Sequence, residues 1–162
     1  MDIYKFVGQE NGDILLEKIT IKESEYNIIK KENGNVLLKK KINHKIDKLD
    51  DMKKYNFRNS KILSCKIDDE NIEKLKYNSI RVKIYEKIGN GNKIIKSSIF
   101  NNIQTIRKDD EGFTYIEDLG ISIQGVDSNK CLLEIITQCI NYKISIEIRI
   151  TLEDESNIFI IF

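Results

Sequence analysis

The chain has 162 residues, of which 40% are hydrophobic and 33% are charged, and its formal net charge is +1. This balance excludes an intrinsically disordered chain, and the length suits one ordinary domain or two small ones. The longest apolar run is the five-residue segment 158–162, whereas a membrane-spanning helix needs about 20 such residues. The first residues show no export signal. We therefore expect no membrane partner and a cytoplasmic protein, or one assembled into a virion after cytoplasmic synthesis.

Two β-hairpins are predicted at the N-terminus, each around an Asn-Gly pair, and their strands are residues 3–9 with 13–21 and residues 26–31 with 36–42. Asn-Gly favours the tight type I′ turn, because both residues tolerate positive φ. The segment Glu-Asn-Gly-Asp-Ile-Leu-Leu at 10–16 resembles Glu-Asn-Gly-Asn-Val-Leu-Leu at 32–38, an offset of 22 residues. The match is either a chance result of the Ile, Asn and Lys bias of the chain or a sign of a real duplication, and the two hairpins would then form a four-stranded meander or a duplicated unit.

Two short helices are predicted next, over residues 44–55 and 69–77. The first has apolar residues at three-residue spacing, and the second begins with an aspartate that suits a helix N-terminus. The chain is expected to be a single β-rich domain over 1–162. The alternative division is a hairpin and helix region, 1–56, followed by a β-sandwich, 57–162, although no low-complexity linker supports it.

The clearest predicted strand is 144–152, where isoleucines and Leu152 alternate with polar residues over nine positions. Residues 80–88 show nearly the same alternation, and Gly89-Asn90-Gly91-Asn92 is interpreted as a hairpin turn after them. The other predicted strands are 93–99, 113–118, 130–140 and 157–162. The last of these does not alternate, so it is either a central strand or a tail strand covered by a partner chain.

The count is about ten strands with one or two short helices. Strands that recur every 8–14 residues with tight turns predict a mainly β fold, an antiparallel β-sandwich or a barrel-like variant of it. The absence of alternating helices argues against a parallel α/β sheet. The chain also has no alanine or proline but contains 32 Ile, 23 Lys and 16 Asn, a bias that indicates an AT-rich genome: a low-GC bacterium, a phage or a large virus.

No catalytic, cofactor-binding or metal-binding residue is predicted. There is no phosphate-binding GxxxxGK[ST] or GxGxxG motif. His44 is the only histidine, and Cys65, Cys131 and Cys139 show no C-x-x-C spacing, so the cysteines are expected to be buried reduced thiols. Acidic clusters fall in predicted loops and helix starts, without EF-hand spacing. We therefore expect a protein that is not an enzyme and binds no cofactor.

Six residues are candidates for an interaction surface. Four of them are predicted to project from one face of the 80–88 strand, where three cations flank an aromatic ring, and two lie in the apolar C-terminal strand: Arg81, Lys83, Tyr85, Lys87, Phe159 and Phe162. Cations neutralise phosphates and a tyrosine stacks on bases, so a nucleic-acid-binding β domain is one alternative. A pI of about 7.6 makes nucleic acid the less favoured partner.

Charge is segregated along the chain, with a net +7 over residues 57–108 and −8 over 109–162. These segments either pair inside one sheet or form surfaces of opposite sign. We therefore favour a non-catalytic protein-interaction or assembly module whose partner is another protein, self or heterologous, such as a phage virion or tail component. The alternative is a small inhibitor or immunity-type protein that blocks a nuclease or defence complex.

Overall fold

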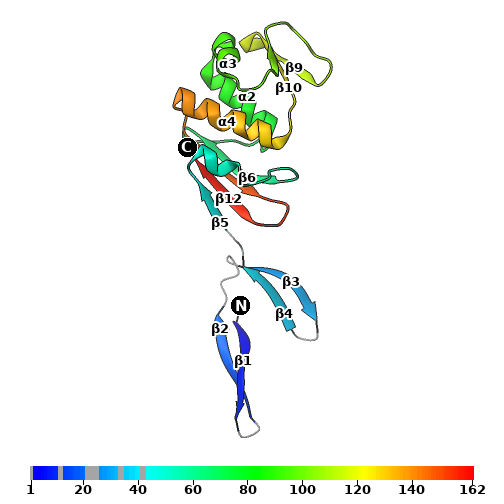
Figure 1. The fold of residues 1–162 in the computed structure, drawn as a ribbon, viewed down its shortest axis with the longest axis vertical. Helices are drawn as coiled ribbons and strands as arrows, with labels where there is room; N and C mark the ends of the chain where they lie inside the picture. Colours follow the sequence, from blue (N-terminus) through cyan, green and yellow to red (C-terminus); the bar gives the residue numbers. More distant parts are fainter. Residues whose placement is uncertain (1, 11–12, 21–25, 33–34, 41–42) are drawn as a thin grey trace. The chain divides into compact units, whose positions relative to one another are not determined.

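The computed structural model describes residues 2–10, 13–20, 26–32, 35–40 and 43–162. The chain forms two compact units, residues 1–42 and 43–162 (Figure 1). The boundary between the units, at residues 42 and 43, precedes the alternative boundary considered above, at residues 56 and 57.

The first unit consists of two β-hairpins. β1 (Asp2–Glu10) pairs antiparallel with β2 (Asp13–Thr20), and β3 (Tyr26–Glu32) pairs antiparallel with β4 (Asn35–Lys40). Both predicted strand pairs are therefore confirmed, while the predicted Asn-Gly turns lie outside the described residues. The two pairs are separate two-stranded sheets, so the four-stranded meander is wrong.

The second unit is built on a five-stranded mixed sheet. The strand order is β5 (Asn43–Ile46), β12 (Asn157–Ile161), β11 (Ile146–Thr151), β6 (Lys61–Ile67) and β7 (Glu70–Asn71). β5 runs parallel to β12, and the other neighbours are antiparallel. A smaller sheet has the order β8 (Ile103–Gln104), β10 (Ile121–Gln124) and β9 (Phe113–Ile116).

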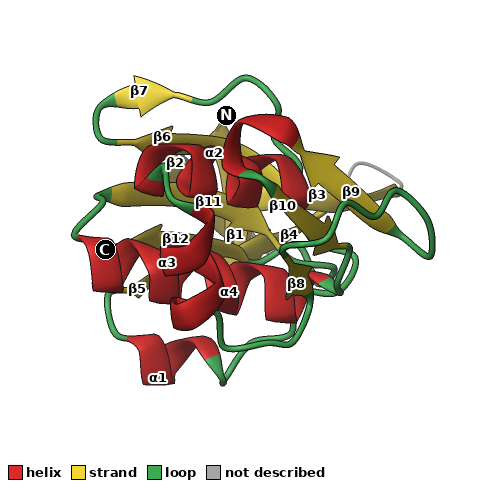
Figure 2. Cartoon of the chain, turned by 90° about the horizontal axis from the view of Figure 1, so that it is seen from above, coloured by secondary structure: helices red, strands yellow, loops and turns green. Residues whose placement is uncertain are grey.

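Four α-helices accompany these sheets: α1 (Leu49–Met52), α2 (Tyr77–Ile88), α3 (Gly91–Ser97) and α4 (Ser128–Tyr142), with a 3₁₀ turn, η2 (Glu117–Leu119). α2 and α4 pack on one side of the large sheet (Figure 1, Figure 2). The fold is mixed α/β, so the prediction of an antiparallel β-sandwich or barrel is wrong.

The error has a definite cause in α2 and α4, which were predicted as the strands 80–88 and 130–140. In α2 the buried residues are Ile80, Arg81, Ile84 and Tyr85, which follow a helical repeat. The isoleucines at 80, 84 and 88, four positions apart, also fit a two-residue alternation. Gly89, interpreted as part of a hairpin turn, ends α2 at φ +66°, which only glycine adopts without strain. The Asp127 side chain accepts a 3.1 Å hydrogen bond from the Lys130 backbone nitrogen and caps α4.

Of the other predicted elements, some are confirmed and some are wrong. β11 alternates as expected, with Ile146, Ile148 and Ile150 buried. β12 lies between β11 and β5, so the C-terminal strand is central in its own sheet. The predicted helix 44–55 is instead β5 followed by the four-residue α1, and the predicted helix 69–77 is wrong, because β7 and an irregular segment occupy it. The predicted strand 93–99 is largely α3.

Gly91, the first residue of α3, makes the closest backbone contact of the described glycines. A Cβ placed on Gly91 would overlap the backbone oxygen of Leu119 and lie 2.7 Å from Cγ2 of Ile121. We expect Gly91→Ala to lower the free energy of unfolding by about 1–3 kcal/mol, because the added methyl overpacks this contact. Gly125→Ala is the control, since its Cβ would come no nearer than 3.7 Å to Asn78. Urea denaturation compares the two variants, and equal losses would contradict the close approach of α3 to η2.

Candidate functional site: a groove between α1 and α4

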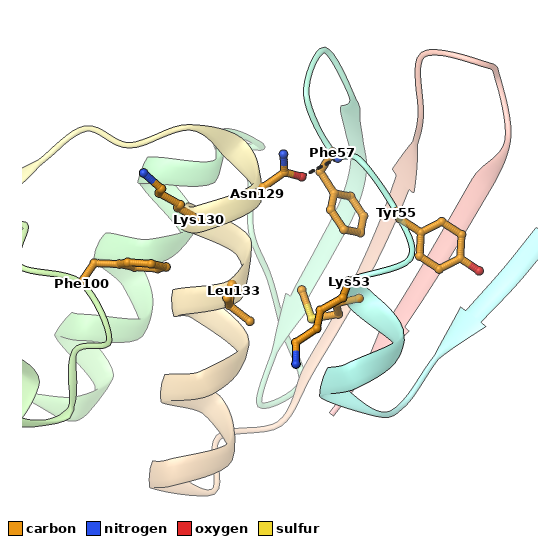
Figure 3. A pocket seen from close by; sticks show the side chains of 8 residues that line it. Lys53, Tyr55, Phe57, Phe100, Asn129, Lys130 and Leu133 are labelled. Carbon is orange, nitrogen blue, oxygen red and sulfur yellow. Dashed lines mark hydrogen bonds between the residues drawn. The ribbon is translucent and has the colours of Figure 1, made fainter.

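A groove of about 420 Å³ lies between α1 and α4 in the second unit (Figure 3). We call it the α1–α4 groove. Its lining comes from α1, the segment after α1, α4 and the segment after α3: Met52, Lys53, Tyr55, Phe57, Phe100, Asn129, Lys130 and Leu133. Three aromatic rings, a methionine and a leucine make it mainly apolar, and its volume is in the range of ligand-binding clefts.

The Phe57 wall is held by side chains at the start of α4. Asn129 Oδ1 accepts a 2.7 Å hydrogen bond from the Phe57 backbone nitrogen, and Ser128 Oγ donates to the Phe57 carbonyl at 2.8 Å. The Asn129 amide nitrogen also donates to Asn56 Oδ1 at 3.0 Å. Residues 72 positions apart in the chain thus fix this wall before any ligand binds, which lowers the entropy cost of binding.

Phe100 forms the opposite wall (Figure 3). The backbone nitrogen of Ile99 donates to Glu134 Oε2 at 3.1 Å, and Ser98 Oγ donates to the Phe100 carbonyl at 2.9 Å. In the orientation in which the Asn102 amide nitrogen faces Phe100, this nitrogen also donates a hydrogen bond to the Phe100 carbonyl at 3.0 Å. Phe100 is therefore positioned by a backbone that is tied to α4.

Behind this wall lies a buried polar network. Glu134 Oε1 accepts hydrogen bonds from Tyr85 Oη at 3.2 Å and from Gln138 Nε2 at 2.9 Å, and Ser97 Oγ donates to Gln138 Oε1 at 2.8 Å. Burial, together with the neighbouring Glu134 carboxylate, raises the pKa of Tyr85, which keeps the phenol protonated as a donor. All of these side chains except Ser97 are buried, and their polar atoms are used within the fold.

Arg81 is the second buried charge. Its Nη2 donates to the Gln124 carbonyl at 2.7 Å, and its Nη1 donates to Asn102 Oδ1 at 2.9 Å in the same Asn102 orientation. Arg81 thereby ties α2 to β10 and to the segment that carries Phe100. Its Nε has no hydrogen-bond partner among the described residues.

The rim of the α1–α4 groove is cationic. Lys53 and Lys130 are exposed, and no carboxylate belongs to the lining. Lys53 Nζ lies 2.8 Å from Asp50 Oδ1, and its hydrogen bond lowers the pKa of Asp50; Lys130 Nζ lies 3.8 Å from Asp127. Exposed pairs of this kind are weak, so a carboxylate on a bound partner can take the place of either aspartate.

A second hollow, of about 470 Å³, lies beside β7 and α2. Its lining is mostly charged and of both signs: Glu70, Glu73, Lys74, Lys83 and Glu86, with Asn71, Ile72, Ser79 and Val82. Lys83 already pairs with Glu86 at 2.7 Å. This hollow has neither the aromatic lining nor the single sign of charge that the α1–α4 groove has.

The six predicted interaction residues do not form one surface. Arg81 and Tyr85 are fully buried in α2, so the predicted outward-facing row is wrong, while Lys83 and Lys87 face solvent and pair with acids. Phe159, on β12, is half-buried with the Arg149 guanidinium 5.2 Å from its ring centroid. Phe162 packs against the main core.

The three cysteines are free and buried, as predicted. Burial raises the pKa of the Cys65 and Cys139 thiols to about 12 and that of Cys131 to about 11, so all three stay protonated near neutrality. His44 packs on Tyr55, with ring centroids 5.4 Å apart. Within the described part of the chain no group of three or more His, Cys, Asp or Glu residues could hold a metal ion.

Sequence reasoning missed the aromatic groove residues. Phe57 lies just after the predicted helix 44–55, and Phe100 lies just after the predicted strand 93–99. No local sequence signal linked the two residues. Comparison with known protein families, with curated proteins and with solved structures found no match. None of the described helices is long and apolar enough to cross a membrane.

Proposed function

We propose that this protein is a non-catalytic protein-interaction module whose α1–α4 groove binds an apolar segment of a partner protein that also carries an acidic side chain. The observation that supports this most is the pairing of preformed aromatic walls, at Phe57 and Phe100, with a lining whose charged residues are both lysines, Lys53 and Lys130. Aromatic anchors in a desolvated cleft supply affinity, and complementary rim charge supplies orientation and on-rate.

The partner chemistry follows from the lining. A segment with two or three apolar side chains would cover Met52, Phe100 and Leu133, and a carboxylate at its edge would meet Lys53 or Lys130. A nucleic-acid strand is a poorer match, because the basic row proposed for it on residues 80–88 is split by the burial of Arg81 and Tyr85.

Two finer forms of the proposal differ in the partner. A phage virion or tail component would bind a neighbouring structural protein, whereas an inhibitor or immunity-type protein would bind an enzyme and lower its activity. Adding the purified chain to an identified partner separates them: loss of nuclease turnover supports the inhibitor, and unchanged turnover with a stable complex supports the assembly component.

A displayed library of random peptides tests the groove itself. We expect the peptides selected by the full chain to be rich in apolar residues with Asp or Glu. Phe100→Ala should weaken their binding about thirtyfold, because a central aromatic anchor typically contributes about 2 kcal/mol. The measurement is the dissociation constant of one selected peptide by isothermal titration calorimetry.

Matched controls lie on α4, the helix that carries Lys130, and just beyond its end. Ile140, on α4, is 46% exposed and outside the lining, so Ile140→Ala should leave peptide affinity unchanged. Lys130→Glu should weaken binding, while Lys143→Glu, just beyond α4, should not. Peptides that lack acidic residues, or that bind Phe100→Ala as tightly as the original chain, would contradict the proposal.

A further inference from the structure

The two N-terminal hairpins share one backbone design. In the first, Phe6 pairs with Leu16 and Gly8 with Leu15, which leaves one extra residue in β1. In the second, Ile28 pairs with Leu38 and Lys30 with Leu37, which leaves one extra residue in β3. Each of these positions differs from its counterpart by 22 residues, so the β-bulge recurs at the same place in both hairpins.

The sequence similarity between the hairpins, at the same offset of 22 residues, extends beyond the match of residues 10–16 with 32–38. Between residues 4–20 and 26–42, seven of 17 positions are identical. The cross-strand pair of Tyr4 with Lys18 recurs as Tyr26 with Lys40. Because bulges bend a strand and are inherited as features of a fold, the two hairpins are copies of one 22-residue unit with the same local twist.

The copies differ in charge. The strands β1 and β2 contain four acidic and two basic residues, a net −2, whereas β3 and β4 contain four basic residues and one acidic, a net +3. Glu17 and Lys39 occupy the same position in the repeat. Two units with the same backbone and opposite charge are therefore complementary to each other.

We propose that residues 1–42 are a self-association module, in which the acidic hairpin of one copy of this chain packs on the basic hairpin of a second copy. A two-stranded hairpin is marginally stable alone, and repeated units gain stability by stacking on neighbours. The complementary pair occurs twice in a two-fold dimer, since each chain supplies one acidic and one basic hairpin. This inference is independent of the α1–α4 groove.

Charge reversal in the full chain tests the dimer by sedimentation equilibrium. The unmodified chain is expected to show about twice its mass of 18.9 kDa at low salt and to dissociate as salt screens the charges. Asp13→Lys with Glu17→Lys makes both hairpins basic, and Lys30→Glu with Lys39→Glu makes both acidic. Each double variant alone should be a monomer.

Mixing the two double variants is the decisive step. In the mixture each basic hairpin of one variant meets an acidic hairpin of the other, so a heterodimer should form, which a contact within one chain cannot produce. Glu117→Lys with Asp118→Lys, in the exposed η2 turn, is the control and should leave the dimer intact. Circular dichroism checks that every variant is folded. A monomer at every concentration, or a dimer that both reversals leave unchanged, overturns the proposal.

Discussion

Glu134→Leu is expected to lower the free energy of unfolding by about 3–5 kcal/mol. The substitution removes the acceptor of three donors: the buried Tyr85 Oη and Gln138 Nε2, and the part-buried backbone nitrogen of Ile99. Unsatisfied buried donors cost about 1–3 kcal/mol each.

Urea denaturation followed by circular dichroism measures this loss. Asn141→Leu is the matched control, because it makes a similar polar-to-apolar change at an exposed position of the same helix and should alter stability by less than about 0.5 kcal/mol. Glu134→Gln should fall between the two, since it retains an acceptor oxygen. A Glu134→Leu variant as stable as Asn141→Leu would mean that the network does not hold Phe100 and α4 together.

The network also shows how far the sequence can predict a buried polar residue. Arg81, Glu134 and Gln138 look like surface residues in any alternating pattern, because charged side chains are rarely fully buried unless paired. Their partners come from α3, β10 and the 98–102 segment, none of which has a local signal that points to them. Only the three-dimensional packing shows that these residues are interior.

The strands that could be predicted are those whose pattern admits one interpretation. In β11, strict alternation is incompatible with a helix, which would expose Ile148 on a different face from Ile146. The hairpins β1–β2 and β3–β4 were predictable from their Asn-Gly pairs. In contrast, residues 80–88, with isoleucines four positions apart, fit both periods, and the absence of alanine and the abundance of isoleucine in the chain favoured strands there and at 130–140.

Helix boundary signals were present but were assigned to turns. Gly89 is a helix C-terminal residue, and Asp127 is a side-chain cap; both residue types also occur in β-turns.

The α1–α4 groove could not be predicted, because Phe57 and Phe100 meet only when α4 packs on the sheet.

At alkaline pH, the free energy of unfolding is expected to fall with rising pH more steeply than the titration of exposed groups alone would cause. Burial raises the pKa of Cys65 and Cys139 to about 12 and that of Cys131 to about 11, from an ordinary value of 9.0. Above pH 9 the unfolded chain releases these protons while the native chain retains them. The native state then binds more protons, so the free energy of unfolding falls as pH rises, by up to about 1.4 kcal/mol per pH unit for each thiol.

The number of protons involved can be measured from urea denaturation between about pH 9 and pH 12, the window set by these pKa values. Cys139→Ala should be less stable at every pH because it leaves a cavity, but its stability should fall less steeply with pH, by one thiol's share. Ile136→Val, a buried change on the same helix, should lower stability without altering the slope. If Cys139→Ala keeps the original slope, the Cys139 thiol is accessible to water in the native state, and the packing of α4 on β6 is looser than the structure shows.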